Sequence, residues 1–244
     1  MTAIITTTAF VPSLTDPRFL QFIKTCEEAE TVGIPIACVY AAPSKITPDV
    51  AEMLRDYGAI PILQDKPGMG ASRRETLQYG LSTPAKVIIW IEPEKYPLVS
   101  LLEPVIAMVN GGYDLVVPRR ESLDSYPAYQ QYSEYSANWT LANITGRYDL
   151  DLMFGPRVLS RTAAELFSSY IGKTPEKDNW EVIFIPVLQA IHYGMKVGFC
   201  PVKYVHPPEQ TKREELDAVI DRKRDQQRGT LIAAMQEEAA RLSS

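Results

Sequence analysis

Short apolar runs alternate with amphipathic segments along the first half of the chain. The runs have the length and the β-branched composition of buried strands, and they lie at residues 3–8, 34–39, 59–63, 86–91 and 113–117. The segments between them carry apolar residues at helical spacing. This alternation predicts parallel βαβ units with right-handed crossovers, and it predicts a ligand site at the carboxyl ends of the strands.

Local signals mark where the helices begin and end. Asp16 precedes Pro17, a pattern typical of an N-cap followed by the first helical turn, and Gly33 is a natural stop. Thr47 and Gly58 bound the next helix in the same way. Further elements are expected as helices from residue 71, at 97–110, within 121–147, at 160–170 and at 179–193, and as a last strand at 196–205.

The pattern divides the chain into two parts. Residues 1–208 carry the α/β alternation, and residues 209–244 form a charged, helix-favouring extension. The extension either packs on the domain or mediates self-association into a homo-oligomer, and the sequence leaves both open. The predicted fold class is therefore α/β, a mostly parallel Rossmann-like sheet flanked by helices, with a C-terminal helical tail.

Composition narrows the class of protein. With 45% hydrophobic and 23% charged residues in a chain of 244, the balance is that of a globular protein. The formal net charge of −5 gives the surface no general attraction for nucleic acid or for an anionic membrane. The apolar runs are too short to span a bilayer. Cys26, Cys38 and Cys200 lie in apolar surroundings without metal-ligand spacing, which is typical of reduced thiols, and no signal peptide is visible, so we expect a cytoplasmic protein.

A glycine-containing turn with two arginines follows the third predicted strand. Gly68 and Gly70 permit a tight turn and a close approach of the backbone, and the helix that starts there favours an anion at its N-terminus. Arg73 and Arg74 are suited to phosphate or carboxylate oxygens. The alternative is a solvated basic turn without a ligand.

Two glutamates follow the fourth predicted strand directly. In an extended Glu-x-Glu segment, Glu92 and Glu94 lie on the same side of the chain. Crowded carboxylates require a neutralising cation, and oxygen ligands suit Mg²⁺ or Mn²⁺ bridged to phosphates. The alternative is an acidic turn in solvent. His206 lies just after the last strand, where it could complete such a site, whereas His192 lies on an apolar helix and is expected to be structural.

The order of these motifs resembles that of the nucleotide-diphospho-sugar glycosyltransferases of the GT-A fold. His206 is similar to the metal-binding histidine of the mannosylglycerate synthase and glucosyl-phosphoglycerate synthase group. The resemblance implies that Glu92, Glu94 and His206 bind Mg²⁺ or Mn²⁺ on the diphosphate of the donor. The family usually has Asp-x-Asp where this chain has Glu-x-Glu, so the metal geometry is expected to differ.

The resemblance also implies roles for residues outside the acidic pair. The nucleotide base is expected to meet the backbone of Thr8, Ala9 and Phe10, with Tyr40 stacking on it. Arg119, Arg120 and Arg157 are candidates for binding an anionic acceptor. Asp178 and Glu181 occupy the region of the base in inverting relatives; the alternative is a capping box at the start of a helix.

The function expected is transfer of a sugar from a nucleotide-diphosphate donor to a small acceptor, for which an anionic compound is one option. A diphosphate leaving group gains negative charge, which the metal and Arg73 or Arg74 would stabilise. The alternatives are a non-catalytic nucleotide-sugar-binding or scaffold protein and, ranked lower, a nucleotidyltransferase, because residues 7–12 after the first strand contain no glycine. The inverting and retaining mechanisms both stay open.

Overall fold

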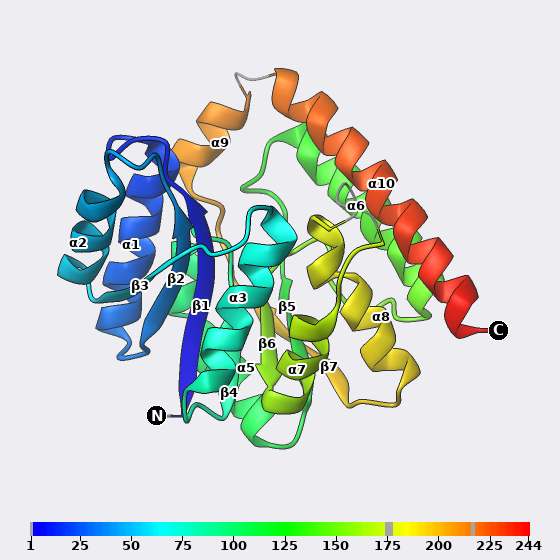
Figure 1. The fold of residues 1–244 in the computed structure, drawn as a ribbon. Helices are drawn as coiled ribbons and strands as arrows, with labels where there is room; N and C mark the ends of the chain where they lie inside the picture. The colour runs from blue at the N-terminus through cyan, green and yellow to red at the C-terminus, as the bar shows by residue number, and fades with distance from the viewer. Residues whose placement is uncertain (1, 174–177, 216–217) are drawn as a thin grey trace.

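A mixed, mostly parallel sheet forms the centre of the molecule (Figure 1). The computed structural model describes residues 2–173, 178–215 and 218–244. Within them the strand order is β3-β2-β1-β4-β6-β5-β7, and only β6 runs antiparallel to its neighbours. The strands are β1 (Ala3–Phe10), β2 (Ile36–Ala41), β3 (Ala59–Leu63), β4 (Val87–Trp90), β5 (Leu115–Arg120), β6 (Arg157–Ser160) and β7 (Val197–Val202).

Helices cover both faces of the sheet because successive strand residues point to opposite sides. Ile5 and Ile89 enter one core, whereas Ile4 and Ile88 enter the other. The first core also receives side chains from α1 (Pro17–Thr31), α2 (Thr47–Asp56), α4 (Tyr96–Val99) and α5 (Leu102–Asn110). The second core receives them from α3 (Met69–Ser82), α6 (Ala128–Thr145), α7 (Arg161–Ser169), the 3₁₀ helix η1 (Trp180–Ile183) and α8 (Ile185–His192). The fold class expected from the sequence is therefore confirmed.

Strand β6 was not expected from the sequence. It is only four residues long and runs directly into α7, so its apolar pattern is too short to be distinguished from the start of a helix. It lies between β4 and β5 and pairs with both in antiparallel fashion. The fifth predicted strand therefore lies two positions away from the fourth.

Capping signals predicted two helix starts correctly. The Asp16 carboxylate accepts the backbone N–H groups of Arg18 and Phe19, and the Ser160 hydroxyl accepts that of Ala163. The single helices expected at 97–110 and 179–193 were wrong, because each is divided into two elements. Proline explains part of the division: Pro186 has no N–H and fits only in the first turn of α8.

The expected starts of two other elements also shift. Helix α6 begins at Ala128, immediately after Pro127, so residues 121–127 are not helical as expected. Strand β5 extends through Arg120, so Arg119 and Arg120 belong to the strand and point to opposite sides, one exposed and one buried. Both nevertheless line the same cavity, of about 380 Å³.

The C-terminal segment packs onto the rest of the chain. Helix α9 (Pro208–Glu215) is followed by α10 (Ala218–Leu242), which lies along α6 and α8 (Figure 1). Leu231, Ala234 and Met235 of α10 are buried in the second core. Among the residues described, no helix has both the length and the apolar character needed to cross a membrane.

Candidate functional site

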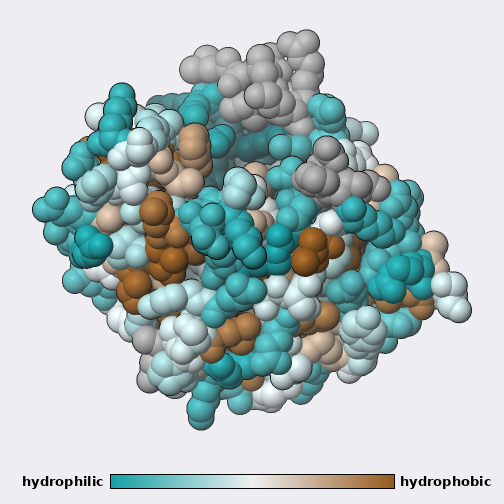
Figure 2. All heavy atoms as spheres, in the orientation of Figure 1, coloured by the Kyte–Doolittle hydropathy of each residue, from teal (hydrophilic) through white to brown (hydrophobic). Residues whose placement is uncertain are grey.

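A cleft of about 720 Å³ opens at the carboxyl ends of β1 and β4. This is the edge where parallel α/β sheets bind ligands. Seven of the residues proposed from the sequence line it, namely Thr8, Ala9, Phe10, Gly68, Arg73, Glu92 and Glu94. We call this space the donor cleft. The face shown in Figure 2 is mostly hydrophilic, with apolar residues in separate patches.

The acidic turn is anchored to the sheet beside β1. The Ile91 N–H donates to the Thr6 carbonyl, and the Thr7 hydroxyl donates to the Ile91 carbonyl at 2.8 Å. The Lys95 N–H then closes the turn on the Glu92 carbonyl. These bonds fix Glu92 and Glu94 at the end of β4, where both side chains line the donor cleft.

Glu92 has one carboxylate oxygen without a hydrogen-bond partner in the part of the chain that the structure describes. Its Oε2 atom is out of contact with solvent and has no hydrogen-bond partner among the described residues. Burial raises the pKa of Glu92, although Lys95 opposes the rise. A buried carboxylate oxygen without a donor is costly, so this atom is poised to receive a hydrogen bond or a cation from a ligand.

Gly155 makes room for Glu92. A Cβ atom built at Gly155 would overlap the carboxylate of Glu92. We predict that Gly155→Ala displaces this carboxylate and weakens nucleotide-diphosphate binding about 10-fold or more, since one misplaced polar contact costs roughly 1–3 kcal/mol. Gly229→Ala is the control, because a Cβ there meets no neighbour. Isothermal titration with UDP and GDP measures the affinity, and equal affinities in the two variants would contradict the prediction.

Arg73 supplies a positive charge to the same cleft. Its guanidinium lies between the rings of Trp90 and Trp180, 5.0 and 4.5 Å from their centres, and one nitrogen donates to the Asn179 carbonyl at 2.8 Å. Burial lowers the pKa of Arg73 to about 10, against the pull of nearby glutamates, so it remains a cation at neutral pH. Its Nε atom has no partner among the described residues, which leaves a donor for a ligand.

Arg74 does not line the donor cleft. Two of its nitrogens bind both carboxylate oxygens of Asp178, at 2.5 and 2.7 Å. The Gly70 N–H donates to the Asp178 carbonyl at 2.9 Å, and a Cβ at Gly70 would overlap Asp178. Gly70 and Arg74 therefore hold the segment at Asp178 against α3, and the geometry favours this structural role over the phosphate contact expected from the sequence.

Neither candidate base lines the donor cleft. The Arg74 bond lowers the pKa of Asp178, whose carboxylate also accepts the Gly172 N–H. Burial raises the pKa of Glu181, whose Oε2 accepts the Asn179 N–H at 3.2 Å. Asn179, and not Asp178, precedes η1 and its side chain makes no capping bond, so the alternative of a capping box that starts at Asp178 is wrong.

His206 faces another set of partners. Its ring stacks on Tyr126 at 4.1 Å between centres, and its Nε2 atom lies 3.4 Å from the Glu214 carboxylate. The side chain is 1% exposed, and burial lowers its pKa. Among the side chains that the structure describes, at residues 2–173, 178–215 and 224–244, no three of His, Cys, Asp or Glu gather closely enough to hold a metal ion.

Lys95 lies beside both halves of the expected metal site. Its ammonium is 5.9 Å from the Tyr126 ring on which His206 stacks. Burial alone would lower the pKa of Lys95, but Tyr126, Tyr204, Glu92 and Glu94 together hold it well above the usual value. A cation shared by the glutamates and His206 would lie next to this ammonium. His206 stacks on Tyr126, faces Glu214 and does not line the donor cleft, so it does not fit a metal held there. Glu92 and Glu94 line that cleft, and their oxygens suit a cation that a diphosphate also ligates.

Three residues proposed for ligand contacts lie elsewhere. Arg157 is fully buried and donates to the backbone carbonyls of Leu152, Phe154, Pro156 and Ile183. The Tyr40 ring is 4% exposed, and its hydroxyl donates to the Thr47 carbonyl at 3.3 Å. Arg119 is exposed and lies over Phe199, outside the donor cleft.

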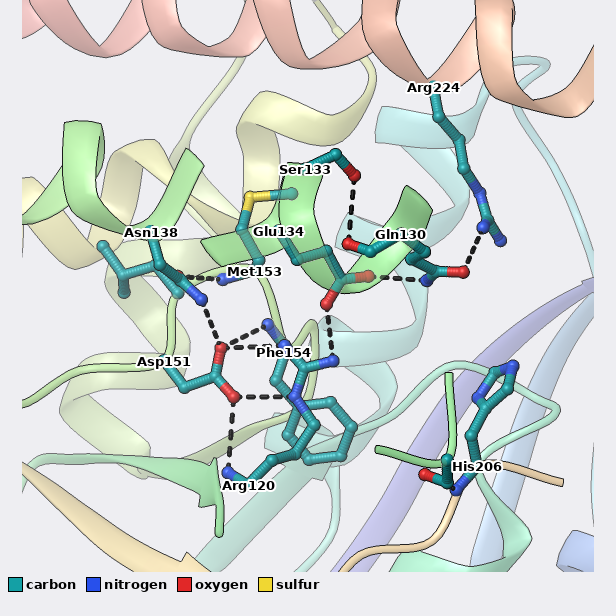
Figure 3. A network of polar contacts seen from close by, with 12 residues as sticks. Arg120, Gln130, Ser133, Glu134, Asn138, Asp151, Met153, Phe154, His206 and Arg224 are labelled. Carbon is teal, nitrogen blue, oxygen red and sulfur yellow. Dashed lines mark hydrogen bonds and ion pairs between the residues drawn. The ribbon is translucent and has the colours of Figure 1, made fainter. Parts of the chain in front are cut away.

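Arg120 is the centre of a buried ionic network (Figure 3). It binds Asp151 through Nε at 2.7 Å and through Nη2 at 2.9 Å, and it pairs with Glu134 of α6 at 2.6 Å. Asn138 donates to the same Asp151 at 2.8 Å. These bonds join β5 and α6 to the loop before β6, so the guanidinium of Arg120 has a structural role.

Glu214 gives the protein a specific acid sensitivity. Burial would raise its pKa, but His206 and Arg224 outweigh burial and hold it at about 2 instead of 4.5. A depressed carboxylate pKa stabilises the fold above about pH 4.5, and this stabilisation is lost as the pH falls through about 2. Between pH 5 and pH 2 we expect wild type to lose on the order of 3 kcal/mol more than Glu214→Gln. Urea denaturation at each pH measures this, and parallel pH profiles would contradict it.

Sequence reasoning missed Lys95, Trp180 and Arg224. Lys95 directly follows the acidic pair, and from the sequence it would be expected to face solvent. In the structure its ammonium lies near the rings of Tyr126, Phe154 and Tyr204. Trp180 was noted only as a neighbour of Asp178, yet it stacks on Arg73. A tryptophan directly before Glu181 and two residues after Asp178 was a signal that could have singled it out.

Comparisons with known proteins identify the fold. No family model matches the sequence, and no curated protein matches it. Glucosyl-3-phosphoglycerate synthase from Mycobacterium tuberculosis, in complex with phosphoglyceric acid, aligns over 98% of this chain and 80% of its own, with a TM-score of 0.58 and 15% identity. The same enzyme was also solved with Mn²⁺, UDP and phosphoglyceric acid.

Two further structures share the architecture. Mannosyl-3-phosphoglycerate synthase from Rubrobacter xylanophilus covers 93% of this chain and 76% of its own, with a TM-score of 0.52 and 18% identity. A CMP:2-keto-3-deoxy-manno-octonic acid synthetase bound to CTP covers 91% and 100%, with a TM-score of 0.54 and 12% identity. At these identities the likeness shows the fold. The chain has the GT-A-like α/β fold of the nucleotide-diphospho-sugar transferases.

Proposed function

We propose that this protein transfers a sugar from a nucleotide-diphosphate donor to a small acceptor, with Mg²⁺ or Mn²⁺ as cofactor. One observation carries the proposal: Glu92, Glu94 and Arg73 meet at the donor cleft, at the carboxyl ends of β1 and β4. Carboxylates beside a buried arginine suit a diphosphate that carries a divalent cation. The sugar-phosphoglycerate synthases that share the fold support this chemistry by analogy.

The residues of the cleft have separate tasks in this reaction. Glu92 and Glu94 would hold the divalent cation, which when bound supplies Lewis-acid stabilisation of the leaving diphosphate. Arg73 adds a fixed positive charge and a free Nε donor to the same leaving group. The segment Thr8 to Phe10 lines the cleft opposite them and is proposed to meet the nucleoside.

A nucleotidyltransferase is a weaker candidate. The CTP-bound synthetase shows that such enzymes share this architecture, so the fold alone does not separate the two reactions. Residues 7–12, after the start of β1, contain no glycine and no lysine or arginine. A nucleoside triphosphate would therefore lack a phosphate-binding loop at the position where nucleotidyltransferases carry one.

A thermal-shift screen tests the proposal. Wild type and Glu94→Ala are heated with UDP-glucose or GDP-mannose, each with Mn²⁺ or with EDTA. A ligand at about 100 times its Kd adds about 2.7 kcal/mol of stability, so we expect the Tm of wild type to rise with one donor plus Mn²⁺. The rise should be smaller with EDTA and in Glu94→Ala. No response to either donor would favour a non-catalytic scaffold.

A further inference from the structure

A second cavity, of about 150 Å³, lies beside the acidic turn. Glu92, Glu94 and Trp180 line both this cavity and the donor cleft. The other walls come from α6, which supplies Gln130 and Glu134, and from α10. We call this space the inner chamber. Because it shares the acidic turn with the donor cleft, a molecule in the chamber would lie next to the reacting end of a bound donor.

Polar atoms without partners gather around the inner chamber. Four of its lining residues carry a buried polar atom that has neither a hydrogen-bond nor an ion-pair partner among the described residues: Glu92 Oε2, Trp180 Nε1, His206 Nδ1 and Gln210 Oε1. The other ring nitrogen of His206, Nε2, faces the Glu214 carboxylate at 3.4 Å. Buried polar groups are normally paired, so such a cluster indicates a ligand or ordered water. The set mixes donors with acceptors, and hydroxyl groups satisfy both kinds at once.

The charges of the chamber do not suit an anionic ligand. Arg224 is bound to Glu214 at 2.6 Å and to Gln130, and Arg228 is bound to Asp225. Lys95 lines the chamber together with the two carboxylates of the acidic turn. Each of the two arginines is therefore neutralised by a carboxylate. The remaining charges are the carboxylates of Glu92 and Glu94 and the single ammonium of Lys95, so the chamber has no excess of positive charge to bind an anion.

Apolar surface completes the wall. Trp180, Phe184, Met153 and Leu231 line the chamber together with these polar groups. Aromatic and aliphatic side chains beside a few hydrogen-bonding groups are typical of a small-molecule site, and they fit the C–H face of a sugar ring.

We propose that the inner chamber binds the acceptor, that the acceptor is a neutral, hydroxyl-rich compound such as a sugar or polyol, and that α10 forms one wall of its site. The term acceptor rests on the proposed function, whereas the chemistry of the ligand rests on the chamber alone. The site differs from the arginine-lined acceptor site expected from the sequence, because Arg120 and Arg157 are both committed to the fold.

Consecutive glutamines on α10 provide a matched test. Both are exposed, but only Gln227 lines the chamber. In isothermal titrations with methyl α-D-glucopyranoside, methyl α-D-mannopyranoside, glycerol and 3-phosphoglycerate, all in the presence of UDP, we expect a neutral compound to bind. Gln210→Leu and Gln227→Leu should weaken that binding about 10-fold, as for the loss of a hydrogen bond, and Gln226→Leu should leave it unchanged.

Several outcomes would overturn the inference. These are saturable binding of 3-phosphoglycerate alone, no binding of any neutral compound, or equal effects of the Gln226 and Gln227 variants. Since Gln227 lies on the surface of α10, its variant keeps the test valid if Gln210→Leu fails to fold. The affinity of the same samples for UDP with Mn²⁺ tests the proposed function separately. If wild type binds a glycoside but does not bind UDP with Mn²⁺, the proposed transferase function is contradicted, whereas the proposed ligand of the chamber is supported.

Discussion

Glu94→Ala should lower the rate of sugar transfer by about 10²–10³-fold, the usual loss when one electrostatic group that stabilises a leaving group is removed. Glu94 lines the donor cleft at the end of β4, where the proposed cation meets the diphosphate. The fold should be unaffected, since no hydrogen bond or ion pair of the Glu94 side chain is seen among the described residues. Steady-state release of UDP or GDP from the donor identified by thermal shift measures the rate.

The matched control for this loss is Glu103→Ala. Glu103 is exposed in the first turn of α5 and does not line the donor cleft. The Glu103→Ala substitution removes one negative charge from the protein, as Glu94→Ala does, but leaves the donor cleft unchanged. A comparable loss of rate in the two variants would mean that net charge, and not the position of Glu94, governs turnover.

Arg120→Met should lower the free energy of unfolding by about 3–5 kcal/mol, because it leaves the buried carboxylates of Asp151 and Glu134 without their cation. The neighbouring arginine is the natural control: Arg119 is exposed, and Arg119→Met should change stability by no more than about 0.5 kcal/mol. Urea denaturation of the two variants measures the difference. Equal stabilities would show that the network in Figure 3 does not hold α6 against the sheet.

The sequence predicted the features that depend on neighbours along the chain. Apolar runs located β1 to β5, Asp16 and Ser160 located helix starts, and the Glu-x-Glu segment located the end of β4. Each of these is a local pattern, in which propensity, capping chemistry and side-chain alternation are read within a few residues.

Local sequence patterns could not predict the features that depend on residues far away in the chain. Arg74 resembles a phosphate ligand until Asp178, more than a hundred residues later, is seen to bind it. His206 resembles a metal ligand until Tyr126 and Glu214 are seen around its ring. The inner chamber was equally hidden, because α10 reaches it by packing on α6, α8 and η1.

The arginines illustrate the same limit most clearly. Arg73, Arg74, Arg120 and Arg157 all lie in segments where a ligand contact was expected. Of these four, only Arg73 lines the donor cleft and has a nitrogen without a hydrogen-bond partner among the described residues. The other three donate their N–H groups to carboxylates or to backbone carbonyls. Charge and position along the chain do not distinguish these cases, but the hydrogen-bond partners of each guanidinium do.

A crystal structure with UDP and Mn²⁺ is the most direct test of the central claim that the acidic turn and Arg73 together bind a metal-carrying diphosphate. The account predicts diphosphate density in the donor cleft within hydrogen-bond distance of Arg73, and an anomalous Mn²⁺ peak bonded to a carboxylate oxygen of Glu92 or Glu94. Nucleotide bound away from the ends of β1 and β4, or a metal coordinated without either glutamate, would contradict it.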